Sequence, residues 1–221
     1  MGHYDAFNST PYRTHMRALA CLRPGQRVLE VGCSTGALSE RMRALGCTVV
    51  GIEQRADAAE RARAFCESVL VGDVERMPLA LPKRSFDVLL LLDVLEHLVD
   101  PAAAVARLVP LVRDAGIVVV ALPNVAHWSI RGQLVRGRFE YVDSGILDRT
   151  HLHLYTIPTA ERLLASAGLE ILEKDIIPDT PFLRFRPRVA SLNYKIARLL
   201  PNLLSTESFF VTRPSPTASS R

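Results

Sequence analysis

The chain has 221 residues, of which 48% are hydrophobic and 23% charged, as is typical of a soluble globular protein that buries a sizeable core. It contains no apolar run near the ~20 residues of a transmembrane helix, and its start lacks the pattern of a secretory signal. The net charge of +4 is concentrated in a basic stretch over 181–204, which argues against general nucleic-acid binding.

The predicted elements of the first half alternate between strands and helices. A short helix over 11–22 comes first, and the predicted strands follow at 27–31, 47–53, 68–73, 86–93 and 115–123. The helices between them are predicted at 37–45, 56–65 and 101–111, the last opened by a first-turn proline, Pro101. This alternation indicates a doubly wound, mostly parallel α/β sheet.

The second half of the chain is less regular. An irregular segment over 124–157 is followed by a helix at 158–167 and by two strands, at 169–177 and 208–213. The basic stretch between these strands is predicted to be helical, and residues 214–221 to be a disordered tail. We therefore expect a single domain over 1–213 with seven strands.

Four cysteines, Cys21, Cys33, Cys47 and Cys66, form no C-x-x-C pair. Their spacing is typical of neither a zinc site nor a disulfide framework. We expect reduced thiols in a cytoplasmic protein, and no metal.

The glycine-rich loop over 32–36, Gly-Cys-Ser-Thr-Gly, admits three interpretations. It matches the G-x-S-x-G elbow of serine hydrolases, but that elbow normally follows several strands, and here it follows the first. A dinucleotide loop needs G-x-G-x-x-G, and Ser34 and Ala37 replace its second and third glycines. The third interpretation is a loop for S-adenosylmethionine (SAM), which has no phosphate to bind.

Acidic residues at the ends of three successive strands favour SAM. Glu30 lies at the end of the first predicted strand, Glu53 ends the second and Asp73 ends the third. Open α/β sheets bind ligands at the carboxyl ends of their strands. Carboxylates there can bind the amino-acid end, the ribose hydroxyls and the adenine amino group, whereas a single acid would more often be a solvated loop charge.

The segments VLEVGCSTG, GIE, GD and FDVLLLLDVLEHLVDP resemble, in order and spacing, the motifs of class I SAM-dependent methyltransferases. The resemblance implies the strand order 3-2-1-4-5-7-6, SAM as cofactor and S-adenosylhomocysteine as product. It departs from the family at Ser34, where glycine is usual. The implied cofactor-binding residues are Tyr12, Glu30, Gly32, Ser34, Gly36, Glu53, Gln54, Asp73, Val74, Leu92, Asp93 and His97. For Tyr12, packing on the sheet edge is the alternative, and for His97 the alternatives are closing the site and acting as a base.

A narrower resemblance follows from LPNVAHW and GRFEYVDSGILDRTHLHLYT. These segments resemble a bacterial subgroup related to methionine-biosynthesis-associated methyltransferase-like proteins, whose members often accompany glycosyltransferases. The resemblance implies O-methylation of a sugar or a glycosylated small molecule. The alternatives are a natural-product hydroxyl, an amine or a carboxylate as acceptor, or a non-catalytic SAM-binding partner. A nicotinamide enzyme is a more distant alternative.

A hydroxyl acceptor also requires a base. We predict His127 and His151 as catalytic residues from their position after the fifth strand, and Asn124, Asp148 and His153 as acceptor-binding residues. Each histidine has the alternative of a hydrogen-bonded structural residue, and Asp148 with Arg149 that of a salt bridge. We name the segment 124–157 the acceptor lid, which is its predicted role.

The basic stretch over 181–204 has three interpretations. The default is an amphipathic helix packed on the core with solvated arginines; the others are a site for an anionic acceptor and contact with an anionic membrane surface, which is not favoured. The sequence leaves the oligomeric state open.

Overall fold

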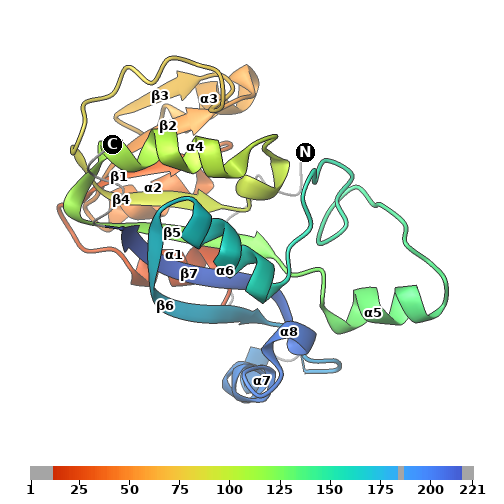
Figure 1. The fold of residues 1–221 in the computed structure, drawn as a ribbon. Helices are drawn as coiled ribbons and strands as arrows, with labels where there is room; N and C mark the ends of the chain where they lie inside the picture. Colours follow the sequence, from red (N-terminus) through yellow and green to blue (C-terminus); the bar gives the residue numbers. More distant parts are fainter. Residues whose placement is uncertain (1–11, 184–186, 216–221) are drawn as a thin grey trace.

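The computed structural model describes residues 12–183 and 187–215, which form a seven-stranded sheet of order β3-β2-β1-β4-β5-β7-β6 with helices around it (Figure 1). The first five strands pair in parallel, and β7 runs antiparallel to both β5 and β6. Their bounds are β1 Arg27–Val31, β2 Thr48–Glu53, β3 Ser68–Val71, β4 Phe86–Leu92, β5 Val112–Pro123, β6 Leu169–Pro178 and β7 Ser205–Pro214. The fold class and the strand order implied by the family resemblance are both confirmed.

The helices lie close to the predicted ranges. They are α1 Thr14–Ala20, α2 Ala37–Ala44, α3 Ala56–Ala62, α4 Pro101–Leu108, α5 Trp128–Val135, α6 Ile157–Ser166, α7 Ala190–Ala197 and α8 Pro201–Leu204, with short 3-10 turns η1 Leu95–His97, η2 Val109–Leu111 and η3 Pro187–Val189. Asp100 caps α4 by accepting a hydrogen bond from the Ala103 amide, and Pro101 opens this helix as predicted.

Alternate residues of the central strands face two hydrophobic cores. Leu29 and Leu91 belong to the larger core, which also contains α4 and α6 residues. Val28 and Leu90 point the other way, into a core shared with α2. Both faces of the sheet are therefore covered, which explains why β4 is apolar throughout.

Two strands begin earlier than predicted. β5 begins at Val112 instead of 115, after a register shift between Phe86 and Val88 of β4, and β7 begins at Ser205 instead of 208. The helix predicted over 101–111 divides into α4 and η2 because Pro110 cannot continue the α-helical hydrogen bonding. These boundaries depend on pairing between strands, which local sequence patterns do not report.

The acceptor lid is less irregular than predicted, because it contains α5. Its two ends are held together where Asn124 pairs with Tyr155 and the Val125 amide donates a 2.7 Å hydrogen bond to the Tyr155 carbonyl. Figure 1 shows α5 extending away from the sheet. The segment thus leaves the sheet edge and returns to it; its role as a lid stays a prediction.

The basic stretch contains η3, α7 and α8, while Arg184 and Arg186 lie outside the described residues. Tyr194 of α7 donates a 2.9 Å hydrogen bond to Asp175 of β6, and Asn193 accepts one from the Thr180 amide. These contacts agree with the default interpretation of a helix packed on the core. Of the predicted tail, residues 216–221 also lie outside the described part. None of the helices described is long and apolar enough to cross a bilayer.

Candidate active site

The loop between β1 and α2, residues 32–36, turns through left-handed backbone conformations. Gly32 and Gly36 have φ values of +73° and +82°. A Cβ atom on Gly36 would lie 2.9 Å from the Ala62 Cα and from the Phe65 Cδ2, so only glycine fits there. Ser34 also has a positive φ, +47°, which explains why a glycine is favoured at this position of the motif. We call this segment the cofactor loop.

Glu53, the last residue of β2, holds the cofactor loop from below. Its carboxylate accepts hydrogen bonds from the backbone amides of Ser34 (2.8 Å) and Arg55 (2.9 Å). Each carboxylate oxygen can accept a further hydrogen bond, so these contacts leave Glu53 able to bind a ribose diol. Gln54, the next residue, is exposed.

The segment after β3 is fixed by its own hydrogen bonds. Asp73 accepts a 2.8 Å hydrogen bond from the Glu75 amide and lies 3.5 Å from the Arg76 Nε. Val74 is buried, and its carbonyl accepts a 2.9 Å hydrogen bond from Arg107 of α4. The predicted adenine contacts therefore sit on a well-supported turn, and the Asp73 carboxylate keeps acceptor capacity.

Glu30 is buried inside the sheet and contacts the protein instead of the surface. Its carboxyl group accepts a hydrogen bond from the Ser39 hydroxyl of α2. Burial raises the pKa of Glu30 to about 8, so the side chain is largely neutral at pH 7. Any influence on the methionine end of a cofactor would pass through the cofactor loop, as the sequence analysis expects.

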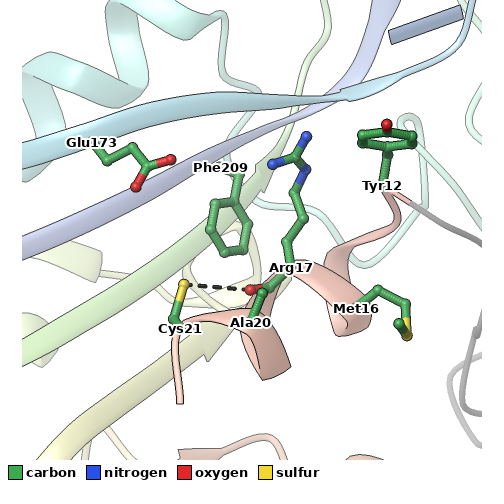
Figure 2. A pocket seen from close by; sticks show the side chains of 7 residues that line it. All are labelled: Tyr12, Met16, Arg17, Ala20, Cys21, Glu173 and Phe209. Carbon is green, nitrogen blue, oxygen red and sulfur yellow. Dashed lines mark hydrogen bonds between the residues drawn. The ribbon is translucent and has the colours of Figure 1, made fainter. Parts of the chain in front are cut away.

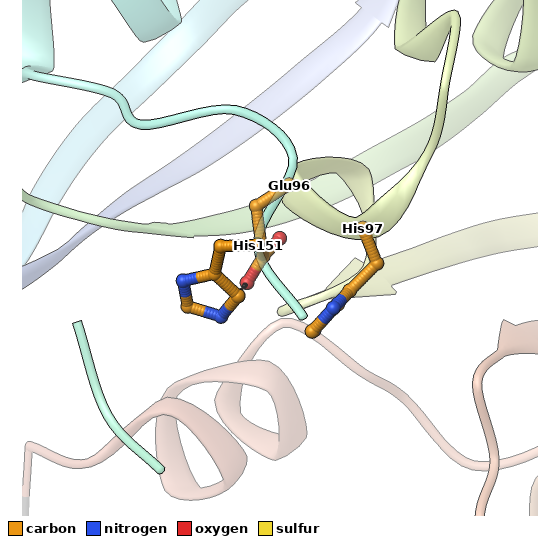
Figure 3. A group of neighbouring side chains, drawn as sticks. All are labelled: Glu96, His97 and His151. Carbon is orange, nitrogen blue, oxygen red and sulfur yellow. Dashed lines mark ion pairs between the residues drawn. The ribbon is translucent and has the colours of Figure 1, made fainter. Parts of the chain in front are cut away.

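A second group of titratable side chains lies beyond the end of β4. We call Asp93, Glu96, His97 and His151 the acid–imidazole cluster. The backbone amides of Leu152 and His153 donate to the Glu96 carbonyl, which docks the acceptor lid on η1. Figure 3 shows how this brings His151 of the lid beside Glu96 and His97.

The distances within this cluster are short. The Glu96 Oε1 lies 3.9 Å from the His151 Nε2. The His97 and His151 rings meet edge to face with centroids 4.8 Å apart, and the His97 Nδ1 lies 3.2 Å from the Thr150 carbonyl oxygen. Among the described residues, neither carboxylate oxygen of Glu96 and not Oδ1 of Asp93 has a hydrogen-bond partner. Buried polar atoms without partners are rare and indicate that a ligand completes the site.

The burial of the cluster sets its protonation. Burial, aided by the charges of Glu207 and Asp148, raises the pKa of Glu96 to about 8. Burial also raises the pKa of Asp93 well above its ordinary value. For His151, burial lowers the pKa, and the hydrogen bond with the Ile146 carbonyl opposes part of this effect. His151 is therefore neutral at pH 7 and available as a proton acceptor.

The hydrogen bonding of His151 also decides its tautomer. Its Nδ1 lies 3.0 Å from the Ile146 carbonyl oxygen, which can only accept. Nδ1 therefore carries the hydrogen, and Nε2, the atom nearest Glu96, has the free lone pair.

The same residues include a set of metal-ligating atoms. Within the described part of the chain, one atom each from Glu96, His97 and His151 lie within 4.8 Å of one another, close enough to hold a metal ion. Nitrogen and carboxylate donors together suit several divalent metals. The prediction that no metal binds stays untested.

His127 and Asn124 have structural contacts. His127 is 1% exposed, with Nδ1 2.8 Å from the Ser129 hydroxyl and Nε2 3.3 Å from the Asp179 carboxylate. Asn124 is fully buried, and its amide nitrogen donates to the carbonyls of Asn202 and Ser205, both at 2.9 Å. These contacts support roles in holding the base of the lid; the predicted contacts with an acceptor gain no support from them.

The other predicted acceptor residues organise the turn around His151. Asp148 accepts hydrogen bonds from the amide (2.8 Å) and hydroxyl (2.6 Å) of Thr150. The alternative salt bridge of Asp148 with Arg149 is wrong, because Arg149 pairs with Asp143 at 2.8 Å. His153 contacts the Val99 carbonyl at 3.3 Å.

Tyr12 packs on α7. Its ring stacks on Tyr194 with centroids 4.7 Å apart, and the Arg17 guanidinium lies over both rings. These contacts favour the packing role that was the alternative for Tyr12. A pocket of about 410 Å³ beside α1, seen in Figure 2, is lined by Tyr12, Met16, Arg17, Ala20, Cys21, Glu173 and Phe209.

Glu207 was missed by the sequence analysis. It lies in β7 opposite Pro123 and accepts a hydrogen bond from the Thr14 hydroxyl. Its charge helps to raise the pKa of Asp93 and Glu96, so it belongs to the surroundings of the acid–imidazole cluster. Because the sequence analysis began this strand at 208, Glu207 fell outside the sheet; extending the strand by three residues identifies it.

Known proteins resemble this chain in sequence. The family described as "Methyltransferase domain" matches residues 4–174. Ubiquinone biosynthesis O-methyltransferase from Rhodopseudomonas palustris (strain TIE-1) is 30% identical over 149 residues, which cover 63% of this chain and 55% of the relative. The protein of the same name from Dinoroseobacter shibae is 33% identical over 190 residues, covering 80% and 74%. The chain spans about half the length of the first of these curated relatives.

Solved structures share the fold at lower identity. A SAM-dependent methyltransferase from Archaeoglobus fulgidus superposes with a TM-score of 0.66 at 16% identity, covering 90% of this chain and 91% of that one. Phosphoethanolamine N-methyltransferase 2 from Haemonchus contortus, in complex with SAM, has a TM-score of 0.61 at 16% identity and covers 91% and 52%. The narrower bacterial subgroup stays a prediction. With the sheet order, the glycine loop and the family match in agreement, the chain belongs to the class I SAM-dependent methyltransferases.

Proposed function

We propose that this protein transfers a methyl group from SAM to a hydroxyl oxygen of a small molecule, with His151 as the proton acceptor. The observation that carries the proposal is a buried, neutral imidazole whose free Nε2 lone pair lies 3.9 Å from the Glu96 carboxyl. It is supported by the names of the curated relatives, which are O-methyltransferases.

The residues at the strand ends fit the proposed cofactor. Glu53 would bind the ribose hydroxyls, Asp73 and Val74 would face adenine, and the cofactor loop would lie against the amino-acid end. Asp93, with its unpartnered buried Oδ1, would face the same end. SAM supplies a methyl group on a sulfonium, which leaves without help from an acid, so the protein mainly aligns the acceptor.

An acceptor hydroxyl must lose its proton as its oxygen attacks, and this is where the chain contributes. A proton taken up at the His151 Nε2 forms an imidazolium beside Glu96. The positive charge lowers the pKa of that carboxyl in turn, so the pair stabilises the charged state. A neutral amine needs no base before it attacks, so a built-in proton acceptor favours a hydroxyl.

The acceptor class is the finer part of the proposal. The sequence resemblance favours a sugar or a glycosylated molecule, while the names of the relatives favour a hydroxyl in quinone biosynthesis. We propose the glycoside as the first class to test and phenols as the second. Incubation with methyl-labelled SAM and panels of glycosides, phenols and amines distinguishes them, with mass spectrometry locating the label.

The expected result is a label on oxygen that depends on His151. His151→Ala should lower turnover by about 10²-fold or more, the usual contribution of a general base, and leave SAM affinity nearly unchanged. His153→Ala is the matched control, because it removes a neighbouring histidine outside the cluster. A label on nitrogen, or normal turnover by His151→Ala, would contradict the proposal. SAM binding without turnover of any acceptor would favour the non-catalytic alternative.

A further inference from the structure

Two of the four cysteines meet under the cofactor loop. Cys33 belongs to this loop, and Cys66 follows α3 four residues after Ala62. Both sulfurs lie beside Gly51 of β2: a Cβ atom there would be 2.6 Å from the Cys33 Sγ and 3.5 Å from the Cys66 Sγ. The two thiols also hydrogen-bond to each other. Gly51 thus leaves the space that the sulfur pair occupies.

The two thiols differ in reactivity. Hydrogen bonds with Cys33 and Ser39, opposed by burial, lower the pKa of Cys66 to about 7. The pKa of Cys33 is raised by the same thiol contact and by burial. Cys66 is half-buried, whereas Cys33 is buried. A partly ionised, accessible thiol beside a second thiol is the arrangement of a peroxide-reactive cysteine with a resolving partner.

We propose that Cys66 and Cys33 form a peroxide-driven, reversible disulfide that weakens SAM binding. This inference rests on the proposed position of SAM against the cofactor loop. The Cys66 thiolate attacks one oxygen of hydrogen peroxide; an S–O bond forms, the O–O bond breaks, and the departing hydroxide takes up a proton to become water. Cys33 then attacks the Cys66 sulfur. The S–S bond forms, the S–O bond breaks, and the second hydroxide leaves as water with the Cys33 proton. Two thiols are oxidised, and one peroxide is reduced to two waters.

The bond would act on the cofactor site through the loop backbone. A disulfide holds its sulfurs at about 2.05 Å, well inside hydrogen-bonding contact, so Cys33 must move toward Cys66. Gly36 already lies against the end of α3, where an added Cβ would be 2.9 Å from the Ala62 Cα. The movement is therefore taken up around Ser34, whose amide donates to Glu53. That displaces both the loop and the proposed ribose ligand.

The test uses a Cys21→Ser/Cys47→Ser background, which keeps only the pair. Hydrogen peroxide should remove two hydrogens from the intact mass, and peptide mapping should join Cys33 to Cys66. Calorimetry should show SAM affinity falling by roughly tenfold or more, which is about 1.4 kcal/mol or more, and recovering with dithiothreitol. With Cys66→Ser added, peroxide should leave both the thiol of Cys33 and SAM affinity unchanged.

Three results would overturn the inference. The first is peroxide treatment that yields no link between Cys33 and Cys66, and the second is a linked protein that binds SAM as tightly as the reduced one. The third is a reduced, folded protein that does not bind SAM; this would refute the proposed cofactor site together with the regulatory claim. The first two would leave the cofactor site intact.

Discussion

Replacing Glu30 by glutamine tests whether a buried neutral acid lies beneath the cofactor loop. Glutamine keeps an oxygen that accepts the Ser39 hydrogen bond, but it has no proton to release. Burial raises the pKa of Glu30 from its ordinary value of 4.5 to about 8. Between these values the folded protein retains the proton and the unfolded chain releases it.

The sign and size of the effect follow from this difference. Since the native state binds more protons, the contribution of Glu30 is fully present below pH 4.5 and is lost as pH rises to about 8. The loss amounts to about 1.4 kcal/mol per pH unit, or about 4 kcal/mol between pH ~5 and ~8. Glu30→Gln should therefore gain stability relative to the wild type by about this amount over the interval.

Urea denaturation of both proteins at several pH values measures the effect. The other buried carboxyls, Asp93, Glu96 and Glu207, are present in both proteins, so their contributions cancel in the difference. Free energies of unfolding that change in parallel from pH ~5 to ~8 would refute the assignment of a neutral Glu30.

Four further predictions concern the loop and the lid. His127→Ala should lower the free energy of unfolding by about 1–3 kcal/mol through lost buried hydrogen bonds and leave SAM affinity unchanged; an equal loss of SAM affinity would argue for a role at the site. Gly36→Ala should destabilise the protein more than Gly25→Ala in thermal melts, because both have positive φ but only Gly36 meets neighbouring atoms; equal shifts in melting temperature would contradict this. In a pH–rate profile, kcat should rise through the pKa of His151, which burial places below 6.5, and stay level at neutral pH; a rise centred above pH ~7 would exclude this base. Treatment with EDTA should not change turnover if His151 acts alone, and a loss that Mg²⁺ restores would instead assign a metal to Glu96, His97 and His151.

Local sequence patterns predicted the elements that carry the cofactor site. The apolar run of β4 and the glycines of the cofactor loop are each determined by near neighbours in the chain, through two-sided burial and positive φ. The acids that follow β1, β2 and β3 come to one edge of the sheet simply because parallel strands end there.

The acceptor side was harder to predict because it depends on distant contacts. His127 and His151 look equivalent in the sequence, as both follow β5. The lid folds back where Asn124 meets Tyr155, and this contact takes His151 to η1, while His127 packs against Asp179. No periodicity within the segment reports such a return. The proximity of Cys33 to Cys66 is hidden for the same reason, since it arises from the packing of α3 against the cofactor loop.

The central claim is tested most directly by isothermal calorimetry with SAM, S-adenosylhomocysteine and NAD, using wild type, Glu53→Ala and an Asp57→Ala control in α3. We predict that the wild type and the control bind the first two ligands and not NAD. Glu53→Ala should lose roughly ten- to a hundredfold in affinity, the effect of removing a charged hydrogen-bond acceptor. A folded wild-type protein that binds neither SAM nor S-adenosylhomocysteine, or a Glu53→Ala variant with unchanged affinity, would contradict the account.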